Sequence, residues 1–411
     1  MVPWQRTLYI LVFVQLVSAI GFSGIFPFLP LYIEDLGTTS GLSVEFMSGL
    51  VFSAQAFTMM LTAPIWGALA DRHGRKLMVA RATLGGSVII LLMAFVQSAE
   101  QLVLLRAIQG MITGVFAALT ALAAASVPRD RMGYALGTLQ VGLWGGVSIG
   151  PLIGGVVADA FGYSAAFYVT AAMLFIAGLL TLWGVHEDFE PVQRERAQSL
   201  GMVAAWRHVL SMPGVPLTYT CRFLSRLGRT MVFPFAPLFV KELLSGGGNV
   251  ATITGLLTGA SALAGTFGAI YLGRMGDRVG HRRILVMTAL AAALLYVPQS
   301  LVVAVWQLFA LQLLAGGAGG GIMPTISALL AGYTDPGEEG AVFGLESSIM
   351  AAARTVAPLF GAALVSWFGL RSVFVATGFM FLVLAVLAQT RLPARAQPAQ
   401  AVPTQDPVAA K

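Results

Sequence analysis

Long apolar runs alternate with short polar segments along almost the whole chain, from about residue 8 to about residue 391. A helix needs about 20 consecutive apolar residues to cross the hydrocarbon core of a bilayer, and most of the runs reach that length. The first run is too long for the core of a signal peptide and has no small-x-small cleavage site after it, so we expect it to be retained. The pattern predicts twelve membrane-spanning helices, at roughly 8–32, 46–70, 77–97, 102–127, 132–160, 165–185, 215–240, 251–272, 284–301, 306–333, 341–367 and 373–391.

Basic residues are distributed unequally between alternate loops of this layout. With the N-terminus in the cytoplasm, nearly all Lys and Arg residues of the loops fall on the cytoplasmic side, and only Lys241 and Arg371 fall on the other. Cytoplasmic loops of membrane proteins carry an excess of Lys and Arg, so this orientation is the favoured one. The sequence therefore predicts that both termini are cytoplasmic.

The charged segment between predicted helices 2 and 3 recurs in the second half of the chain. GALADRHGRK, from Gly67 to Lys76, is matched by GRMGDRVGHR, from Gly273 to Arg282, 206 positions later. The repeat extends to FPFLPL in helix 1 and FPFAPL in helix 7, and to glycines around helices 4, 5, 10 and 11. Because six helices separate equivalent positions, the two halves share one orientation, and such parallel repeats place the substrate path between them.

These patterns predict an all-α integral membrane protein with twelve transmembrane helices in two pseudo-symmetric six-helix bundles. The N-terminal bundle occupies residues 1–185 and the C-terminal bundle residues 214–392. Residues 186–213 form a cytoplasmic linker that lies on the membrane surface. The Pro-, Ala- and Gln-rich residues 393–411 form a disordered cytoplasmic tail.

The composition excludes several other classes of protein. The chain is 57% hydrophobic and 10% charged, with a mean hydropathy of +0.82, which a water-soluble domain could not accommodate. The pI of 9.7 comes mainly from loop arginines, so it indicates topology and not a nucleic-acid partner. The single cysteine, Cys221, excludes an internal disulfide and a Cys-rich metal site. No phosphate-binding GxxxxGK[ST] loop occurs, and the four histidines lie in predicted cytoplasmic loops, so an enzyme or an ATP-driven pump lacks a credible site.

Three motifs, together with the twelve spans and the two parallel halves, resemble the major facilitator superfamily over residues 6–392. GALADRHGRK resembles its motif A, LRAIQGMITG (Leu105 to Gly114) its motif B, and GVSIGPLIGG (Gly146 to Gly155) its motif C. Motif C is associated with drug:proton antiporters, and the chain most resembles the twelve-helix members of that group in bacteria. The resemblance implies a multi-pass protein of the bacterial inner membrane. It would export amphipathic small molecules, such as antibiotics, in exchange for protons by alternating access. The proton gradient would be the energy source, no cofactor would be required, and nothing requires more than a monomer.

Motif A and its copy contain the residues that the resemblance implies as a conformational latch on the cytoplasmic side. Asp71 would lie beside the start of helix 11, where a carboxylate is stabilised by about 0.3–1 kcal/mol. The alternative is a solvated loop whose arginines only set the orientation. The predicted latch consists of Gly67, Asp71, Arg72, Gly74, Arg75, Asp277 and Arg278.

Motif C brings small residues to one face of helix 5 around a proline. Small residues permit close helix contact, and proline removes a backbone hydrogen bond. The resemblance implies a bend at the interface of the halves that seals the path, and the alternative is tight packing alone. The residues concerned are Gly146, Gly150, Pro151, Gly154 and Gly155.

Two charged residues inside predicted spans are candidates for proton coupling. Arg106 lies in helix 4, and its counterpart in the repeat is Leu313, so symmetry does not require it. A charge in a bilayer is costly and is a functional candidate by default. The alternative is an arginine that pairs with backbone carbonyls or reaches the membrane surface. Glu346 is the one carboxylate that we place inside a span, with Arg354 over the same face of helix 11; it could carry a proton or form a structural pair.

Helix 7 carries Arg222, Arg226 and Arg229, which lie within about 60° on one helical face. Three cations cannot face lipid, so this face must meet water, acids or an anionic ligand. With Arg354, these arginines are candidate substrate-binding residues; the alternatives are pairing with Glu346 or a later start of helix 7. Helix 1 has no acid before Glu34, which differs from cation exporters of the family. A transporter of an organic anion or metabolite is therefore the second hypothesis.

Overall fold

The computed structural model describes residues 3–187, 198–334 and 338–393, and regular structure there is helical. The first half contains α1 (Pro3–Gly24), α2 (Leu29–Leu36), α3 (Val44–His73), α4 (Arg75–Met93), α5 (Ala99–Ile112), α6 (Val115–Ser126), α7 (Met132–Phe161) and α8 (Tyr163–Gly184). The second contains α9 (Gln198–Ser211), α10 (Val215–Val232), α11 (Ala236–Leu243), α12 (Val250–Val279), α13 (His281–Tyr296), α14 (Val305–Gly320), α15 (Ile322–Tyr333), α16 (Glu339–Phe368) and α17 (Ser372–Thr390). Short 3₁₀ turns at Arg129–Arg131 and Val297–Leu301 complete the helical structure of the described residues.

The twelve predicted spans correspond in order to these helices. Four of them are broken in two, as α1–α2, α5–α6, α10–α11 and α14–α15. The breaks after α1 and α10 contain Pro27 and Pro234 of the repeated FPF motif, and proline cannot donate the hydrogen bond that would continue a helix. Among the described residues, eleven spans are long and apolar enough to cross a membrane by themselves. The α10–α11 segment is the exception, because three arginines lower its apolarity.

The internal repeat of the sequence is also a repeat of backbone geometry. Gly74 and Gly280 end α3 and α12 with φ of 93° and 102°, and Gly162 and Gly369 end α7 and α16 with φ of 87° and 80°. Only glycine adopts positive φ without strain, and each of these residues allows an immediate turn into the next helix. The two halves are therefore built on one plan, as the repeat predicts.

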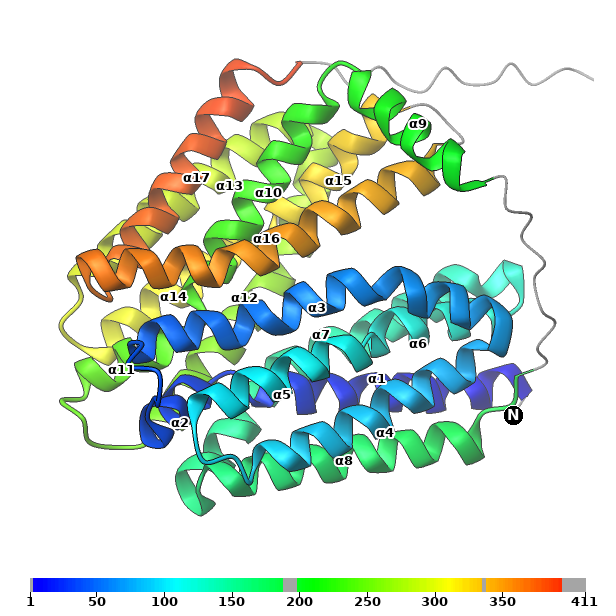
Figure 1. Cartoon of the computed structure of the whole chain (residues 1–411). Helices are drawn as coiled ribbons and strands as arrows, with labels where there is room; N and C mark the ends of the chain where they lie inside the picture. Colours follow the sequence, from blue (N-terminus) through cyan, green and yellow to red (C-terminus); the bar gives the residue numbers. More distant parts are fainter. Residues whose placement is uncertain (1–2, 188–197, 335–337, 394–411) are drawn as a thin grey trace, which may run out of the picture.

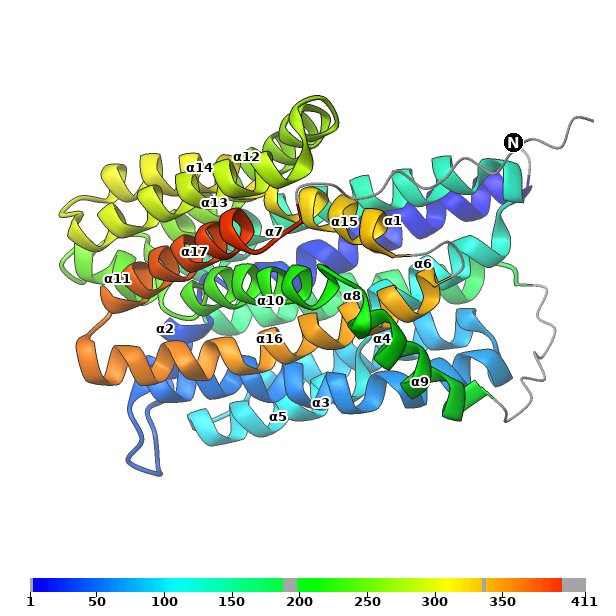
Figure 2. The same cartoon turned by 90° about the horizontal axis from the view of Figure 1, so that it is seen from above.

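The two halves meet along α3 with α16 and along α7 with α12 (Figure 1). We call the membrane end with the loops 72–76, 128–131 and 280–283 the basic end, and the other end the opposite end. In Figure 1, α3 and α16 approach each other toward the opposite end and separate toward the basic end. Figure 2, the view from above, shows α10 and α16 running alongside each other over the first half.

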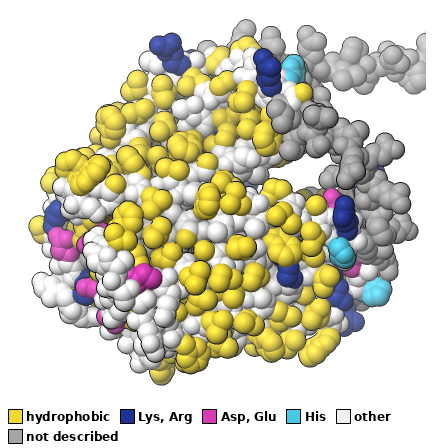
Figure 3. All heavy atoms as spheres, in the orientation of Figure 1, with side chains coloured by type: hydrophobic (Ala, Val, Ile, Leu, Met, Phe, Trp, Pro, Cys, Tyr) yellow, Lys and Arg dark blue, Asp and Glu magenta, His cyan; other side chains and the backbone are white. Residues whose placement is uncertain are grey.

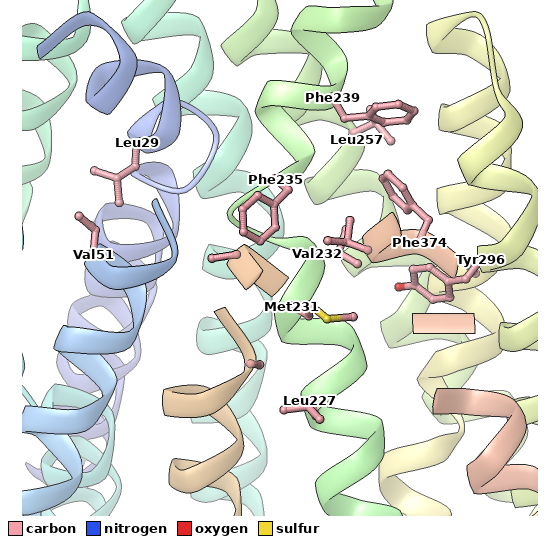
Figure 4. Close-up of a cluster of buried hydrophobic side chains, with 14 of the residues drawn as sticks. Leu29, Val51, Leu227, Met231, Val232, Phe235, Phe239, Leu257, Tyr296 and Phe374 are labelled. Carbon is pink, nitrogen blue, oxygen red and sulfur yellow. The ribbon is translucent and has the colours of Figure 1, made fainter. Parts of the chain in front are cut away.

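The buried apolar core shows where the halves are joined. One large cluster contains residues of both halves, and Figure 4 labels Leu29 and Val51 of the first half together with Phe235 and Phe374 of the second. The first-half members of this cluster all lie toward the opposite end. A second cluster, formed around Leu11, Val79, Leu119 and Leu139, contains residues of the first half only. The halves therefore share a core near the opposite end alone.

Candidate functional site

Motif C forms a contact between the backbones of α7 and α12 near the opposite end. A Cβ atom at Gly155 would collide with the carbonyl oxygen of Ala251, and one at Gly255 with the carbonyl oxygen of Pro151. Since the obstructing atoms are backbone, no side-chain rotation could relieve the collision. The two helices are therefore in direct contact because both have glycine at the crossing.

The other face of motif C packs inside the first half. Cβ atoms at Gly146, Gly150 and Gly154 would each collide with the backbone of α1, and the Ser23 hydroxyl donates to the carbonyl of Gly146 at 3.3 Å. Motif C thus holds α7 between α1 of its own half and α12 of the other half. Its predicted place at the interface applies to Pro151 and Gly155, while its other three glycines pack against α1.

Polar contacts reinforce this junction. The Asp159 carboxylate accepts hydrogen bonds from the backbone N–H groups of Ala251 at 3.3 Å and Thr252 at 2.7 Å, in the first turn of α12. An ion pair of 2.8 Å joins Glu34 of α2 to Lys241 of α11. A carboxylate is favoured at a helix N-terminus, so Asp159 stabilises the closed arrangement of α7 and α12. Sequence reasoning missed both contacts, because their partners are far apart along the chain.

The second pair of helices, α3 and α16, also meets near the opposite end. A Cβ atom at Gly49 would come within 2.7 Å of the Pro358 carbonyl oxygen. Beyond this junction, at the surface of the opposite end, a cavity of about 380 Å³ is lined by residues that include Glu34, Glu45 and Glu242. The path between the halves is therefore closed beneath this cavity.

At the basic end, the two halves are not packed against each other in this way. Cβ atoms at Gly67, Gly133 and Gly340 would meet nothing within 4 Å. Five of the six residues from Ala63 to Ala68 on α3 are exposed, and the sixth, Trp66, is partly covered. Figure 3 shows the surface hollowed between the two halves on this side. The structure is thus closed at the opposite end and open at the basic end.

Motif A lies at the open end. Glu187, just after α8, accepts hydrogen bonds from the backbone N–H groups of Arg75 at 2.9 Å and Lys76 at 2.7 Å, which caps the start of α4. In the second copy, Asp277 is exposed and pairs with His281 at 3.4 Å, one turn along the chain. The latch formed by Asp71 and its neighbours therefore stays a prediction, as do the roles of Arg72 and Arg278, both exposed here.

We expect Asp71→Asn to reduce transport about tenfold while the protein stays folded and inserted, since the amide keeps the size but loses the charge that a helix N-terminus favours. Initial transport rates and the melting temperature of the purified protein would be compared. Asp130→Asn is the control, because Asp130 is an exposed loop carboxylate that pairs with Arg131 beside it. Normal turnover of the Asp71 variant would eliminate the latch.

Arg106 is buried in the first half, with 1% of its surface exposed. Its guanidinium donates to the side-chain oxygens of Gln55 at 3.0 Å and Gln109 at 2.9 Å, and it lies over the Phe52 ring at 5.8 Å. Two of its nitrogens, Nε and Nη2, are buried without a hydrogen-bond partner among the described residues. Arg106 therefore neither reaches the membrane surface nor pairs with backbone carbonyls. The sequence did not identify the two glutamines.

The second half contains the other group of buried charges. Arg222 forms an ion pair with Glu346, and also donates to the Met323 carbonyl at 3.0 Å and the Ser327 hydroxyl at 3.1 Å. Arg229 donates to the Gly319 carbonyl in a long bond of 3.4 Å. Of the alternatives left open by the sequence, pairing with Glu346 thus applies to Arg222.

Arg226 and Arg354 differ from these two arginines. In the described chain, neither has an ion pair or a hydrogen bond, although the charges of Arg222, Arg229 and Arg354 all act on Arg226. Arg354 is exposed on α16, one turn from the contact of Pro358 with α3. Glu346 pairs with Arg222 and not with Arg354, so the sequence placed the carboxylate inside a span and offered both partners, and the structure shows the pair with Arg222.

The described residues contain no group of three His, Cys, Asp or Glu side chains that could hold a metal ion. What they contain is two similar bundles, joined at one membrane end, apart at the other, with charges buried in both. This arrangement defines a secondary transporter and not an enzyme. A sequence model of the Major Facilitator Superfamily matches residues 11–220 and 218–410, and the chain belongs to that superfamily.

Relatives support this assignment over nearly the full length. The multidrug resistance protein MdtG of Enterobacter lignolyticus (strain SCF1) is 35% identical over 407 residues, which cover 98% of this chain and 96% of the relative. MdtG of Serratia proteamaculans (strain 568) is 37% identical over 387 residues, covering 94% and 93%. The predicted family is confirmed, and the chain is a multi-pass membrane transporter of bacterial type.

Solved structures agree on the fold. A bacterial homologue of the human lysosomal transporter Spinster, inward-facing and occupied, superposes with a TM-score of 0.79 at 14% identity, over 98% of this chain and 100% of that one. The human organic anion transporter MFSD10 gives a TM-score of 0.66 at 19% identity, over 95% and 100%. At these identities the likeness concerns the fold alone.

Proposed function

We propose that the protein exports amphipathic small molecules in exchange for protons, by alternating access between its two bundles. The observation that carries this proposal is the glycine contact of α7 with α12, which joins the halves at one end while the other end is open. Such a junction lets one bundle rock against the other around a central site. The names of the MdtG relatives support drugs as substrates.

The basic end faces the cytoplasm in this proposal, because Lys and Arg are enriched in cytoplasmic loops. Both termini are then cytoplasmic, in the inner membrane of a bacterium. Residues 1–185 and 214–392 are the two moving bundles. The remainder of the predicted linker and tail, 188–197 and 394–411, lies outside the described residues. The protein acts as a monomer, needs no cofactor and takes its energy from the proton gradient.

In this proposal, proton coupling involves two sites, Glu346 with Arg222 in the second half and Arg106 in the first. In the state described, substrate enters the open cleft from the cytoplasm, and Glu346 holds Arg222 in an ion pair. Protonation of Glu346 from the outside, in the alternate state, would neutralise the carboxylate and release Arg222. Arg106, held by Gln55 and Gln109, keeps a fixed positive charge in the other bundle and favours release of the proton on the cytoplasmic side.

Transport of an organic anion is the second candidate function. The observation that favours it is the excess of arginine over carboxylate on α10 and α16. An anion that crosses the bilayer needs neutralising charges along its path. The two candidates differ in the charge of the substrate and not in the fold.

Proton movement in energised everted membrane vesicles tests the proposal. Lipophilic cations, neutral drugs and organic anions would be added in parallel, and we expect proton release on addition of a substrate. Release with a cation or neutral drug supports the multidrug antiporter, while release with anions alone supports the second candidate. Vesicles without the protein are the control. No response to any class, with transport of a labelled compound still measurable, would contradict proton coupling.

A further inference from the structure

Four arginines and one carboxylate lie together on α10 and α16. Arg222, Arg226 and Arg229 follow one face of α10, and Arg354 and Glu346 come from α16, which packs beside it. The charges of the other three arginines all act on Arg226. Mutual repulsion of cations is strong where water is scarce, so the group as a whole favours a further negative charge.

The contacts divide these arginines into a fixed pair and an available pair. Arg222 is held by Glu346 and by α15, and Arg229 by the weak bond to Gly319. Arg226 and Arg354 have no hydrogen bond to any described residue, and Arg226 has its Nε buried. The guanidinium group of arginine can donate two parallel hydrogen bonds to a carboxylate or phosphate. Arg226 and Arg354 donate no such bonds to the described residues, so they can donate them to a ligand.

The available pair can be reached from the open cleft. Arg354 is exposed and lies one turn toward the basic end from the junction of α16 with α3. The opposite side of α10 is fixed, because Met231 packs against Gly361 of α16, and Figure 4 shows Leu227 and Met231 within the apolar cluster. This packing favours the orientation of α10 in which its arginines lie on the other side of the helix.

An apolar surface adjoins the charges. Phe26 of the first half contacts Phe52 at 5.7 Å and Phe233 of the second half at 6.2 Å between ring centroids. Phe233 lies one turn beyond Arg229 and is 40% exposed. These three rings join the halves next to the arginine face, so one molecule could contact rings and arginines together.

We propose that the substrates are amphipathic organic anions whose carboxylate or phosphate group binds between Arg226 and Arg354, with the apolar part against Phe26, Phe52 and Phe233. Glu346 is the internal competitor for these charges, since its carboxylate lies in the same group and occupies Arg222. This inference rests on the proposed transport function and names its substrate class. The other carboxylates of the described helices lie near the membrane ends, which leaves cations without a partner at this depth.

Matched probes test the charge preference. We would measure binding of 1-naphthoate, 1-naphthyl phosphate, 1-naphthamide and 1-naphthylmethylammonium to the full-length protein in nanodiscs by calorimetry, with empty nanodiscs as the blank. The four probes share one aromatic body and differ in charge. At least one of the two anions should bind about tenfold more tightly than the amide, and the ammonium most weakly. Equal affinity for all four, or no binding by either anion, would overturn the proposal.

Variants locate the site. Arg226→Gln and Arg354→Gln should each weaken anion binding about tenfold and leave the affinity for 1-naphthamide unchanged. Glu346→Gln should instead strengthen anion binding several-fold, because it removes the competing carboxylate. Arg391→Gln is the control, because it removes the same charge from an exposed position at the end of α17. If Arg226→Gln does not fold, Arg354→Gln decides, because Arg354 is exposed and its loss leaves no buried partner. Anion binding that is unaffected by Arg354→Gln would contradict the site.

The vesicle assay separates the two proposals. Arginine-dependent anion binding without proton movement would leave this site in place and contradict proton coupling. Proton release by neutral or cationic drugs, unchanged in Arg226→Gln and Arg354→Gln, would leave the exporter in place and contradict the anion site.

Discussion

Replacing Gly155 with alanine is expected to reduce transport about tenfold or more, although the change adds a single methyl group. The methyl carbon would collide with the carbonyl oxygen of Ala251, so α7 and α12 would have to move apart. Overpacking of this kind costs about 1–3 kcal/mol, and each 1.4 kcal/mol changes an equilibrium about tenfold. The cost falls on the state closed at the opposite end, so the population of that state should drop.

Two measurements check this expectation. Transport rates would be compared with distances between spin labels at Ser40→Cys and Asn249→Cys, one in each half at the opposite end, after Cys221→Ala. A longer distance with slower transport is expected. Gly145→Ala is the matched control on the same helix, because its Cβ would meet only the Leu16 side chain at 3.7 Å, an ordinary contact. Wild-type transport and an unchanged distance in Gly155→Ala would show that the contact does not control the closed state.

Replacing Arg106 with methionine should greatly reduce proton-driven transport and yet raise the thermal stability of the protein. Arg106 is buried with Nε and Nη2 unpartnered in the described structure, and its contacts are neutral amides and not a carboxylate. A buried charge without a counter-charge is costly, and an apolar side chain of similar volume often removes that cost. A residue kept at the expense of stability is typical of a functional site. If Arg106 couples proton movement to transport, we expect a loss of at least about tenfold in proton-driven transport.

Measuring transport and melting temperature on the same variant distinguishes a functional role of Arg106 from a structural one. Arg81→Met is the control, since Arg81 lies in the same half, stacked on Trp66 at 3.4 Å from the ring centroid, and also has two buried nitrogens without a partner among the described residues. That variant should transport within a few-fold of wild type. A lower melting temperature together with lost transport in Arg106→Met would instead indicate a structural role for Arg106.

The helices were predictable from local sequence to a large extent. Apolar runs separated by polar loops give the spans, because a bilayer requires each span to satisfy its own backbone hydrogen bonds. The repeated FPF motif and the turn glycines Gly74 and Gly280 mark breaks and turns that the structure contains in both halves. The α10 segment was predicted as a span with the others, although among the described residues it is not one of the eleven that are long and apolar enough to cross a membrane by themselves.

Partners of the charged residues were not predictable in the same way. The sequence placed Arg106 and Glu346 inside spans and left pairing with Glu346 open for the helix 7 arginines, but it did not show which of them pairs. Gln55 lies 51 residues from Arg106 and was not identified at all. Asp159 was missed because its partner is the backbone of α12, and a backbone amide leaves no trace in residue type. The sequence signal that could have identified Asp159 is a carboxylate near the end of a predicted helix, four residues after the motif C glycines.

The sequence by itself determined the number and order of the helices, the internal repeat and the presence of arginines in the second half. These follow from apolarity and spacing, which act locally along the chain. The tertiary structure alone decided which end is closed, which arginine pairs with Glu346, and that Arg226 and Arg354 have no hydrogen bond to any described residue. The reason is physical: contacts between helices depend on how two bundles are placed against each other, and one sequence supports more than one such placement.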